Sequence, residues 1–359
     1  MITRFAVLGA GNGGQAIAAH LTLKGFDVSL YDRYEGAIAP VRVRGGVRLT
    51  GQVTGFARIG CVTTDIAQAV EGCSVLLVVV PAFAHAYILR AVAPHLTDGQ
   101  IVALTPGATG GALEARRILT ELGVADRVLL AETESLFYAC RLTAPAQVKI
   151  NAVKKRLALA ALPGRQTGTV LGVLQGAFPQ LEAAPNVLHT SLHNANPIVH
   201  PPLSLLNLTY CERMGGALDF YSESAQPSAV RLVERVDAEQ MAVAAALGVQ
   251  AQSFRQWIER VYGLRAETTL DLFRALGAEI YAGIPGPNGP QARYVSEDIP
   301  MGLVPMAALG RAAGVDTPVM DLLIGMGSVL AGVDFGRDGR TLERLGLAGL
   351  TVQQILRSV

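Results

Sequence analysis

The segment RFAVLGAGNGGQAIAAHL, residues 4–21, determines the fold of the first half of the chain. It begins with apolar residues typical of a buried strand, turns on glycines, and continues with the apolar i, i+3, i+4 spacing of an amphipathic helix. Gly9, Gly11 and Gly14 form the pattern G-x-G-x-x-G, whose glycines permit a tight turn, close approach to a pyrophosphate, and packing of the helix on the strand. The pyrophosphate would bind at the helix N-terminus, where unpaired N–H groups favour negative charge. The candidate residues are Gly9, Gly11, Asn12, Gly13 and Gly14.

A second strand, DVSLYD (residues 27–32), ends on a carboxylate. Asp32 follows Gly14 by eighteen positions, close to the roughly 20 residues expected for the acidic residue that binds a ribose 2′-hydroxyl. This spacing favours NAD as the cofactor. Arg33 comes next and could bind the 2′-phosphate of NADP instead, so NADP stays open. The alternative is a glycine turn followed by a solvated surface aspartate.

Three further apolar strands follow in the order that a doubly wound parallel sheet needs, an α/β fold of Rossmann type. Ligands of such sheets bind beyond the carboxyl ends of the strands. The loop that starts at Pro81 and the loop TPGATGGA are therefore expected beside the cofactor, and Pro81 is a candidate contact. His85, in the first of these loops, fits a helix start or a cofactor-lining position better than an acid/base role. The strands are VLLVVVP (75–81), QIVALTPG (100–107) and RVLLAETES (127–135).

The composition argues against several classes of protein. The 359 residues suffice for two domains. Thirty Lys and Arg against 29 Asp and Glu give a net charge of +1 without long runs of either sign, so we expect neither nucleic-acid nor membrane-surface binding. The longest apolar candidate, CSVLLVVVPAFAHAY (73–87), is shorter than a membrane span of roughly 20 residues. This apolar segment is instead typical of a strand that is buried on both faces of a parallel sheet.

The N-terminus and the cysteines indicate a cytoplasmic protein. MITRFAVLGAG has no basic region followed by a long apolar core, so it predicts no signal peptide. The four cysteines are scattered, without a C-x-x-C pair or metal-ligand spacing, and we expect reduced thiols and no metal site. They are Cys61, Cys73, Cys140 and Cys211.

The pattern of the chain changes near LALAALPGRQTG, which ends at Gly168. A helix and a short strand in VLGVLQGAFPQLEAAPNV (170–187) close the first half, and helical periodicity dominates afterwards. We therefore predict a dinucleotide-binding domain at residues 1–187 and an all-α substrate and catalytic domain at residues 188–359. Apolar helices such as MDLLIGMGSVLAG (320–332) predict a homodimer.

One proline- and glycine-rich segment interrupts the helical half. YAGIPGPNGPQARYVSEDIPMGLVP (281–305) predicts a long irregular loop that carries Arg293, Glu297 and Asp298. Loops of this length inside a compact domain tend to be functional. The alternative is an ordered surface loop with solvated charges.

The helical half contains no lysine, because all four lysines precede residue 156. A proton donor there must be of another type, and histidine is best suited near neutral pH. His189, His193 and His200 are the candidates. Asn196 and His200 are four residues apart and would share a helical face.

The prolines around His200 limit any helix there. Pro197 and Pro201 predict about one helical turn. The residue before a proline is pushed out of the helical region, which would place His200 at a sharply defined exit of the chain. Such an exit fixes an imidazole for catalysis or simply ends a helix, and both interpretations remain open.

Five segments together resemble the opine dehydrogenases, the family of octopine and nopaline dehydrogenases, and the resemblance runs nearly end to end. One departure is Thr105, where the family has asparagine in a loop on the cofactor side. The segments are VLGAGNGGQAIAAHL (7–21), TPGATGGALEARRIL (105–119), VLHTSLHNANPIVHPP (187–202), ARYVSEDIPMGLVP (292–305) and GRTLERLGLAGLT (339–351).

The resemblance implies an activity and several site residues. Members of the family join the amine of an amino acid to a 2-oxo acid through an imine, which NADH or NADPH reduces. The catalytic histidine would be His200 and its partner carboxylate Asp298, with Arg293 and Asn196 as candidate substrate-binding residues. Apolar residues near Asp298 favour an amino acid with an apolar side chain. The alternatives are a 2-hydroxy- or 3-hydroxy-acid dehydrogenase of similar architecture, and a dinucleotide-binding sensor without catalysis.

Overall fold

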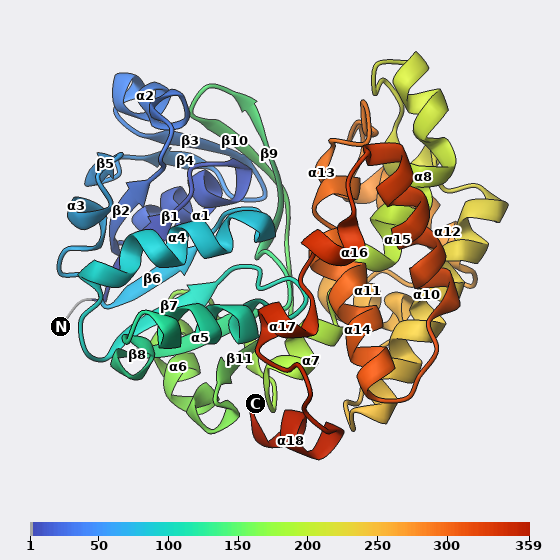
Figure 1. Ribbon diagram of the computed structural model, residues 1–359. Helices are drawn as coiled ribbons and strands as arrows, with labels where there is room; N and C mark the ends of the chain where they lie inside the picture. Colours follow the sequence, from blue (N-terminus) through green and yellow to red (C-terminus); the bar gives the residue numbers. More distant parts are fainter. Residues whose placement is uncertain (1–2) are drawn as a thin grey trace. The chain divides into compact units, whose positions relative to one another are not determined.

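The glycine-rich segment folds as the strand, turn and helix that its sequence predicts. In the computed structural model, which describes residues 3–359, β1 (Arg4–Leu8) leads into a turn that ends at Gly11 (Figure 1). Gly11 caps the N-terminus of α1 (Asn12–Leu23) with an extended backbone. The last four residues of β1 are fully buried, as expected for a central strand of a parallel sheet.

An eight-stranded sheet forms the centre of the first half of the chain. The strand order is β12-β11-β8-β7-β6-β1-β2-β5. Neighbouring strands are parallel, except that β11 runs antiparallel to β8, so the predicted doubly wound sheet is confirmed. Besides β1, and taken in the order of the sheet, the strands are β12 (Leu181–Ala183), β11 (Leu157–Leu162), β8 (Val128–Thr133), β7 (Gln100–Leu104), β6 (Val75–Val78), β2 (Asp27–Tyr31) and β5 (Cys61–Thr63).

The winding of the chain reverses at β1. From β1 the chain proceeds to β2 on one side, and it later continues through β6, β7 and β8 on the other. Open α/β sheets bind ligands beyond the carboxyl ends of the strands at such a reversal. Gly9, Asp32 and Pro81 follow β1, β2 and β6 at this edge.

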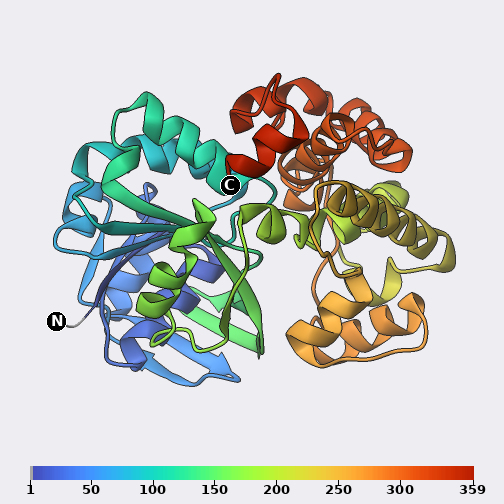
Figure 2. The same cartoon turned by 90° about the horizontal axis from the view of Figure 1, so that it is seen from below.

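Helices cover both faces of the large sheet. Figure 2 shows α4 and α5 on one face and α1 and α6 on the other. The remaining helices of this half are α2 (Glu35–Arg44) and α3 (Ile66–Val70), with short 3-10 turns η1 (Ala82–Ala84), η2 (Ala93–His95), η3 (Ala125–Arg127) and η4 (Gly164–Gln166). Of the helices that cover the sheet in Figure 2, α4 spans His85–Val92, α5 spans Gly111–Glu121 and α6 spans Thr167–Leu174.

A second sheet, which the sequence did not predict, packs against α1. Its four strands have the order β4-β3-β10-β9, and α1 contacts strands of both sheets. Buried residues of the large sheet, α1 and the second sheet form one hydrophobic core. The strands are β3 (Val47–Gly51), β4 (Gly55–Ala57), β9 (Tyr138–Ala144) and β10 (Gln147–Val153).

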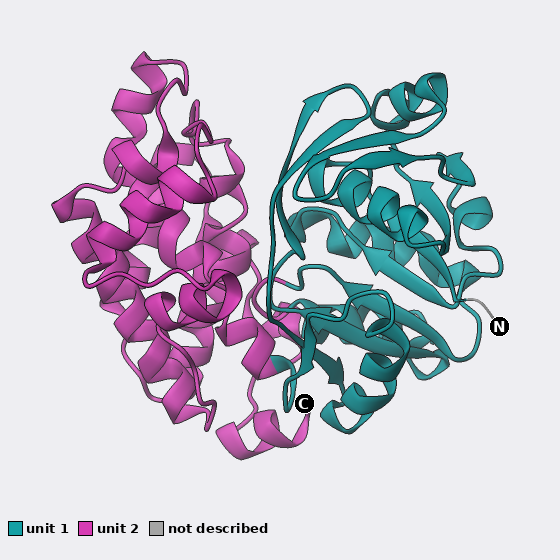
Figure 3. Cartoon of the chain, turned by 180° about the vertical axis from the view of Figure 1, so that it is seen from behind, with its two compact units in different colours: residues 1–107, 111–187 teal, residues 108–110, 188–359 magenta. Residues whose placement is uncertain are grey.

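The chain divides into two compact units (Figure 3). The first comprises Met1–Gly107 and Gly111–Val187, and the second comprises Ala108–Gly110 and Leu188–Val359. The second unit is helical. Its first helix, α7 (Val187–Leu192), starts one residue before Leu188, where the main segment of the unit begins. The further elements are α8 (Asn196–Arg213), α9 (Phe220–Glu223), α10 (Pro227–Ala246), α11 (Phe254–Tyr262), α12 (Thr269–Glu279), α13 (Arg293–Ser296), the π-helical turn η5 (Ile299–Leu303), α14 (Val304–Ala312), α15 (Pro318–Ala331), α16 (Phe335–Asp338), α17 (Leu342–Leu345) and α18 (Val352–Arg357).

The prediction that prolines limit the helix around His200 to one turn is wrong. α8 runs for eighteen residues with Pro201 and Pro202 inside it. Pro197 lies in the first turn, where its missing N–H has no intrahelical partner to lose. Pro201 and Pro202 each remove one helical hydrogen bond, and the packing of α8 against α10, α13, α15 and η5 compensates for that loss.

The prediction of an irregular loop over residues 281–305 is partly wrong. The second half of this segment forms α13, η5 and the start of α14. Within η5 the N–H of Leu303 donates to the carbonyl oxygen of Asp298 at 3.0 Å, a spacing of five residues that defines a π turn. Such turns occur frequently at functional sites.

Within residues 3–359, no single helix is long and apolar enough to cross a membrane. By length and composition alone, one bent pair, Pro318–Ala331 with Phe335–Leu345, passes that test.

Candidate active site

The three glycines of the G-x-G-x-x-G pattern meet three different geometric requirements. Gly9 has a φ of +120°, and a Cβ there would lie 2.3 Å from the carbonyl oxygen of Val79. A Cβ on Gly14 would lie 1.7 Å from the carbonyl oxygen of Gly9, so α1 packs closely on the turn. Around Gly11, no atom of the described residues lies within 4 Å of such a Cβ. The turn therefore fits a pyrophosphate at the start of α1.

Asn12 and Gly13 secure this turn to neighbouring strands and loops. The side-chain oxygen of Asn12 accepts a hydrogen bond from the N–H of Leu142 in β9 at 2.8 Å. A Cβ on Gly13 would lie 2.9 Å from the side chain of Leu136. Asn12 thus anchors the turn to β9, and the missing side chain of Gly13 leaves room for Leu136; the glycine pattern alone did not indicate either role.

The carboxylate of Asp32 lies directly beside the glycine-rich turn. One oxygen accepts from the N–H of Ala10 at 2.8 Å and the other from the N–H of Tyr34 at 3.0 Å. Each carboxylate oxygen has two lone pairs, so both oxygens can still accept from a ribose hydroxyl. A carboxylate fixed here disfavours the 2′-phosphate of NADP through charge repulsion.

Arg33 extends between two exposed tyrosines. Its guanidinium carbon lies 4.8 Å from the ring centre of Tyr34 and 4.2 Å from that of Tyr87. Cation–π contacts at such exposed positions contribute about 0.5–1 kcal/mol each. The stacked guanidinium is therefore held at the end of β2, next to Asp32.

Pro81 and His85 lie in the loop that follows β6. Pro81 precedes η1, and a Cβ on Gly9 would lie 2.7 Å from the side chain of Val80, so this loop borders the glycine-rich turn. His85 is 1% exposed and is the first residue of α4. It occupies a helix start, as the sequence predicted.

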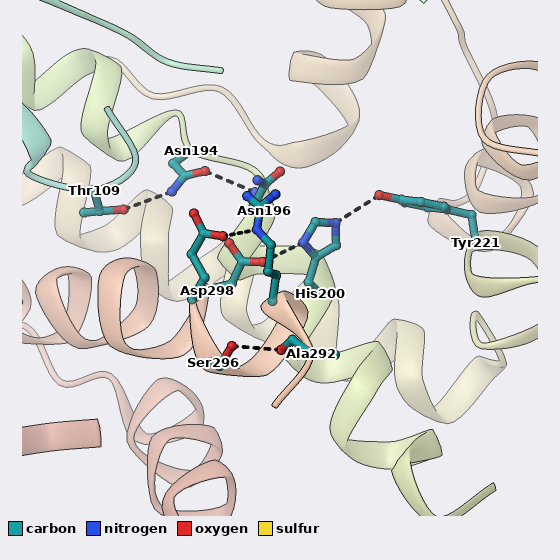
Figure 4. A network of polar contacts seen from close by, with 10 residues as sticks. Thr109, Asn194, Asn196, His200, Tyr221, Ala292, Ser296 and Asp298 are labelled. Atoms are coloured by element: carbon teal, nitrogen blue, oxygen red, sulfur yellow. Dashed lines mark hydrogen bonds and ion pairs between the residues drawn. The ribbon is translucent and has the colours of Figure 1, made fainter. Parts of the chain in front are cut away.

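His200 and Asp298 meet in the second unit (Figure 4). Nδ1 of the imidazole lies 2.7 Å from Oδ2 of Asp298, and each residue is 8% exposed. His200 lies in the second turn of α8, and Asp298 precedes η5. The close packing of these elements is visible at Gly302, where a Cβ would lie 2.6 Å from the side chain of Pro197.

The partner of each imidazole nitrogen assigns the tautomer of His200. A carboxylate only accepts hydrogen bonds, so Nδ1 carries the proton and Nε2 holds the lone pair when the ring is neutral. The carboxylate of Asp298 also stabilises the ring when Nε2 gains a proton. Neutral His200 is thus set up as a base at Nε2, and its protonated form as an acid.

Aromatic side chains that the sequence did not single out surround His200. The Nε2 atom lies 2.9 Å from the hydroxyl of Tyr221 (Figure 4). The ring of Tyr294 lies 4.6 Å from that of His200, centre to centre, and stacks on Phe220. Tyr221 is 21 positions from His200, and no spacing rule for helices or strands connects them.

Of the other two candidate histidines, His193 holds a structural position. Nδ1 of His193 lies 2.6 Å from the carbonyl oxygen of His189, and its Nε2 accepts from the N–H of Gln252 at 3.1 Å. Both ring nitrogens of His193 are therefore committed to the backbone. Burial lowers the pKa of His189, and neighbouring His193 lowers it further.

Asn196 lies on α8 together with His200, and Arg293 lies on α13, just before Asp298 in the chain. Arg293 begins α13; its Nε donates to Glu297, and its side chain is 61% exposed. Asn196 is the exposed first residue of α8, one turn before His200. The backbone N–H of Asn196 donates to the side-chain oxygen of Asn194 at 3.3 Å (Figure 4).

The short segment Ala108–Gly110 is anchored within the second unit. The N–H of Gly110 donates to the hydroxyl of Ser191 at 2.9 Å, and the side chain of Asn194 donates to the hydroxyl of Thr109 at 3.3 Å. The fully buried guanidinium of Arg340 donates to the carbonyl oxygen of Thr109 at 2.8 Å. The segment therefore connects to the start of α8 through Asn194.

Comparison with protein-family models matches both halves of the chain. The helical-domain model of NAD/NADP octopine/nopaline dehydrogenase matches residues 183–331. The model of ketopantoate reductase PanE/ApbA matches residues 5–164.

Curated relatives and solved structures agree with these matches. The opine dehydrogenase of Arthrobacter sp. (strain 1C) is 42% identical over 356 residues, which cover 99% of this chain and 98% of the relative. The octopine dehydrogenase of Pecten maximus is 28% identical over 308 residues, 77% of this chain and 75% of the relative. An octopine dehydrogenase solved with NADH and agmatine has a TM-score of 0.77 at 23% identity, covering 99% and 98% of the two chains. A yersinopine dehydrogenase with NADP⁺ has a TM-score of 0.74 at 16% identity, covering 100% and 99%.

The doubly wound sheet, the helical unit that follows it and the match to a curated dehydrogenase over nearly the whole chain define an NAD(P)-dependent dehydrogenase. More narrowly, the chain belongs to the opine dehydrogenase family. It is an oxidoreductase that acts on CH–NH groups and condenses an amino acid with a 2-oxo acid reductively. The resemblance, the activity and the NAD(P) dependence predicted from the sequence are confirmed.

Proposed function

We propose that His200 is the general acid and base of this reductive condensation and that Asp298 orients it. Condensation of the amine with the 2-oxo acid gives a carbinolamine, whose hydroxyl must gain a proton to leave as water. The imine nitrogen must then be protonated before its carbon accepts a hydride. A histidine with one nitrogen fixed by a carboxylate supplies and recovers these protons near neutral pH. Asp298 stabilises the charged ring at each protonated stage.

The single observation that carries the proposal is the contact between Nδ1 of His200 and Oδ2 of Asp298 at 2.7 Å. The two residues are 98 positions apart and both are buried. Burying charge is costly unless it is paired and hydrogen-bonded, and buried, paired titratable groups gather at functional sites, which supports a functional role for this pair.

The experiment is a two-substrate assay. NADH oxidation by the purified protein should require an amino acid and a 2-oxo acid together, and should yield the secondary amine in a one-to-one ratio. Oxidation of NADH with the 2-oxo acid alone would contradict the proposal, because a hydroxy-acid dehydrogenase needs no amine.

We propose that the glycine-rich turn and Asp32 hold the cofactor, with Pro81 bordering it. NADH or NADPH supplies the hydride when bound. The backbone at Gly11 receives the pyrophosphate, and Asp32 accepts hydrogen bonds from the adenosine ribose. The two backbone donors that fix the Asp32 carboxylate support a preference for NAD over NADP. Arg33, stacked on two tyrosines, would then border the adenosine.

We propose that Arg293 and Asn196 bind the carboxylates of the substrates. Both substrates and the product carry carboxylates, and a guanidinium offers them a planar pair of donors. The Nε of Arg293 is occupied by Glu297, and the exposure of the side chain leaves its terminal nitrogens for a ligand. Asn196 lies on the same face of α8 as His200.

We propose an amino acid with an apolar side chain as the amine substrate. The rings of Phe220 and Tyr294 lie within 6 Å of the His200 ring, centre to centre, and the five residues of η5 beside Asp298 are buried. These surroundings favour an aliphatic or aromatic side chain. A panel assay should give kcat/KM for leucine or methionine at least tenfold above that for arginine, and the reverse order would contradict this substrate class.

We further propose a cytoplasmic homodimer, with residues 1–187 binding the dinucleotide and residues 188–359 binding the substrates. The four cysteines are free thiols, which suits a reducing compartment. An exposed apolar stripe on α15 and the turn after it supports the dimer. The stripe consists of Leu322, Met326, Val329, Leu330 and Val333.

A further inference from the structure

Both nitrogens of the His200 imidazole already have protein partners. Nδ1 is 2.7 Å from Asp298, and Nε2 is 2.9 Å from the hydroxyl of Tyr221. An imidazole nitrogen has one lone pair or one proton in the plane of the ring. While Tyr221 occupies that direction, a substrate atom has no hydrogen-bonding position on His200.

Tyr221 is held firmly in this position. It belongs to α9. The side chain of Asp219 caps the N-terminus of this helix by accepting a hydrogen bond from the N–H of Ser222 at 3.4 Å. The other oxygen of Asp219 accepts from the N–H of Gly283 at 2.8 Å. The phenol ring stacks on Tyr281 with centres 4.3 Å apart, and Tyr221 is 8% exposed. Swinging the ring aside would break this stack and disturb α9.

We propose that Tyr221 carries the proton between His200 and the reacting substrate, an inference that rests on the acid/base role of His200. A hydroxyl accepts with its oxygen and donates with its proton at the same time. In the direction of condensation, the phenol O–H bond breaks as its proton passes to the carbinolamine oxygen or the imine nitrogen. The phenol oxygen simultaneously takes the proton from Nε2 of the imidazolium. The phenol ends neutral, the imidazole ends neutral, and the substrate has gained one proton.

The relay explains why the pair can be so deeply placed. His200 needs no direct contact with solvent or substrate, because the hydroxyl spans the distance. Asp298, His200 and Tyr221 form a series of hydrogen-bonded groups. At one end Asp298 keeps a proton on Nδ1 of the imidazole, and at the other end Tyr221 presents the transferable proton. The geometry at Nε2 is suited to both protonation states, since the hydroxyl donates to the neutral ring and accepts from the charged ring.

The first test replaces only the hydroxyl. Tyr221→Phe should lower kcat at least a hundredfold, within the range by which acid/base groups contribute, while KM for both substrates and Kd for NADH change by less than about threefold. Tyr262→Phe is the matched control, because it removes a phenol hydroxyl that pairs with Tyr281 at 2.6 Å and does not contact His200. Its kcat should stay within about threefold of wild type. Retention of more than a fifth of wild-type kcat in Tyr221→Phe would overturn the relay.

The second test has its main readout in the wild-type protein. In mixtures of H₂O and D₂O, a relay moves two protons together, so wild-type kcat should fall along a bowed curve as the deuterium fraction rises. The residual activity of Tyr221→Phe should fall along a straight line. A straight line or no isotope effect in wild type would also overturn the relay.

The His200→Ala variant separates the relay from the acid/base role of His200. Loss of turnover in this variant beside normal turnover in Tyr221→Phe rejects the relay alone, whereas full turnover in His200→Ala rejects the acid/base role itself.

Discussion

At the scale of single residues, the imidazole of His200 shows how neighbours assign a chemical role. Its two nitrogens are equivalent in the sequence but not in the structure, because a carboxylate faces one and a phenol hydroxyl faces the other. His193 makes the contrast clear, since both of its nitrogens bind backbone groups. The difference between the two histidines is one of partners and not of burial, as both are nearly inaccessible.

His200→Ala should lower kcat at least a hundredfold and leave the Kd of NADH nearly unchanged. The substitution removes the proposed acid and base, whereas the glycine-rich turn that we propose as the cofactor site belongs to the other unit. Steady-state kinetics and fluorescence titration of NADH measure the two quantities. His193→Gln, which changes a histidine bound to backbone on both sides, is the control. Undiminished turnover in His200→Ala would show that the proton comes from another group.

Asp32→Ser should raise the KM for NADH at least tenfold and increase the ratio of kcat/KM for NADPH over NADH by a similar factor. The variant removes the carboxylate that we propose binds the ribose hydroxyls, and with it the charge that would repel a 2′-phosphate. Asp27→Ser, at the opposite end of β2, controls for loss of an aspartate from the same strand. An unchanged cofactor ratio would mean that the Asp32 carboxylate does not face the ribose.

Residue types with strong chemical signatures were predictable from the sequence, and those without one were not. The spacing of Gly9, Gly11, Gly14 and Asp32 follows from the geometry of one strand–turn–helix unit, so a linear pattern reveals it. Nothing in the sequence connects Tyr221 to His200, because their contact depends on how α8 and α9 pack. Tyrosine is also common in cores and gives no signal by composition.

At the scale of elements, the placement of α8 against η5 sets the distance between His200 and Asp298. The two elements meet at Gly302 and Pro197, where a side chain has no room. The sequence interpretation treated the prolines of α8 as helix breakers. Two of them instead lie in the second turn, where tertiary packing outweighs the loss of two hydrogen bonds.

Gly302→Ala should lower kcat at least tenfold and reduce stability by about 1–3 kcal/mol, the usual cost of an overpacked core. The added Cβ would lie 2.6 Å from Pro197 and push η5, with Asp298, away from α8. Kinetics and thermal unfolding check both effects. Gly172→Ala in α6 is the control, since no atom of residues 3–359 would lie within 4 Å of its Cβ. Equal behaviour of the two variants would mean that the contact does not set the site geometry.

Asp237 makes the junction of α10 and α11 sensitive to pH. Its side chain accepts from the N–H of Phe254 at 2.9 Å. Burial raises its pKa from 3.8 to about 6, assisted by Glu234 and opposed by the Phe254 bond. The folded state thus binds a proton more tightly than the unfolded state, so this group adds stability as pH falls through about 6 and costs stability at higher pH.

Asp237→Asn should therefore raise the melting temperature at pH 8, with a gain of about 1–2 kcal/mol, and the gain should shrink at pH 5. The amide oxygen can still accept the Phe254 bond. Differential scanning calorimetry at the two pH values measures the change. Asp98→Asn is the control because its side chain is 91% exposed. A gain of the same size at both pH values would contradict a titrating carboxylate.

At the scale of the whole molecule, the large sheet and its winding were predictable, and the second sheet was not. Long apolar runs such as β6 signal strands buried on both faces. The strands of the second sheet are short or partly exposed, and β3 pairs with β10 about a hundred residues later. The burial of β10 alternates along its length, so the period-2 pattern was present but weak beside the central strands.

Val329→Glu should convert the proposed dimer to a monomer, because Val329 is 82% exposed in the middle of the apolar stripe on α15 and a charge is costly in a dry interface. Size-exclusion chromatography with light scattering measures the molar mass. Val43→Glu is the control, since Val43 is 90% exposed on α2 outside the stripe. A monomeric wild type, or a dimeric Val329→Glu, would contradict the interface.

The short segment Ala108–Gly110 limits how either unit of this chain could be joined to a unit of another protein. The chain crosses between its two units three times, because this segment belongs to the second unit while residues on both sides belong to the first. A fragment that ends at Val187 would therefore keep a tip whose hydrogen-bonding partners, Ser191, Asn194 and Arg340, are encoded downstream. Chimaeras with another reductase therefore need matching loop tips as well as a junction at residue 187.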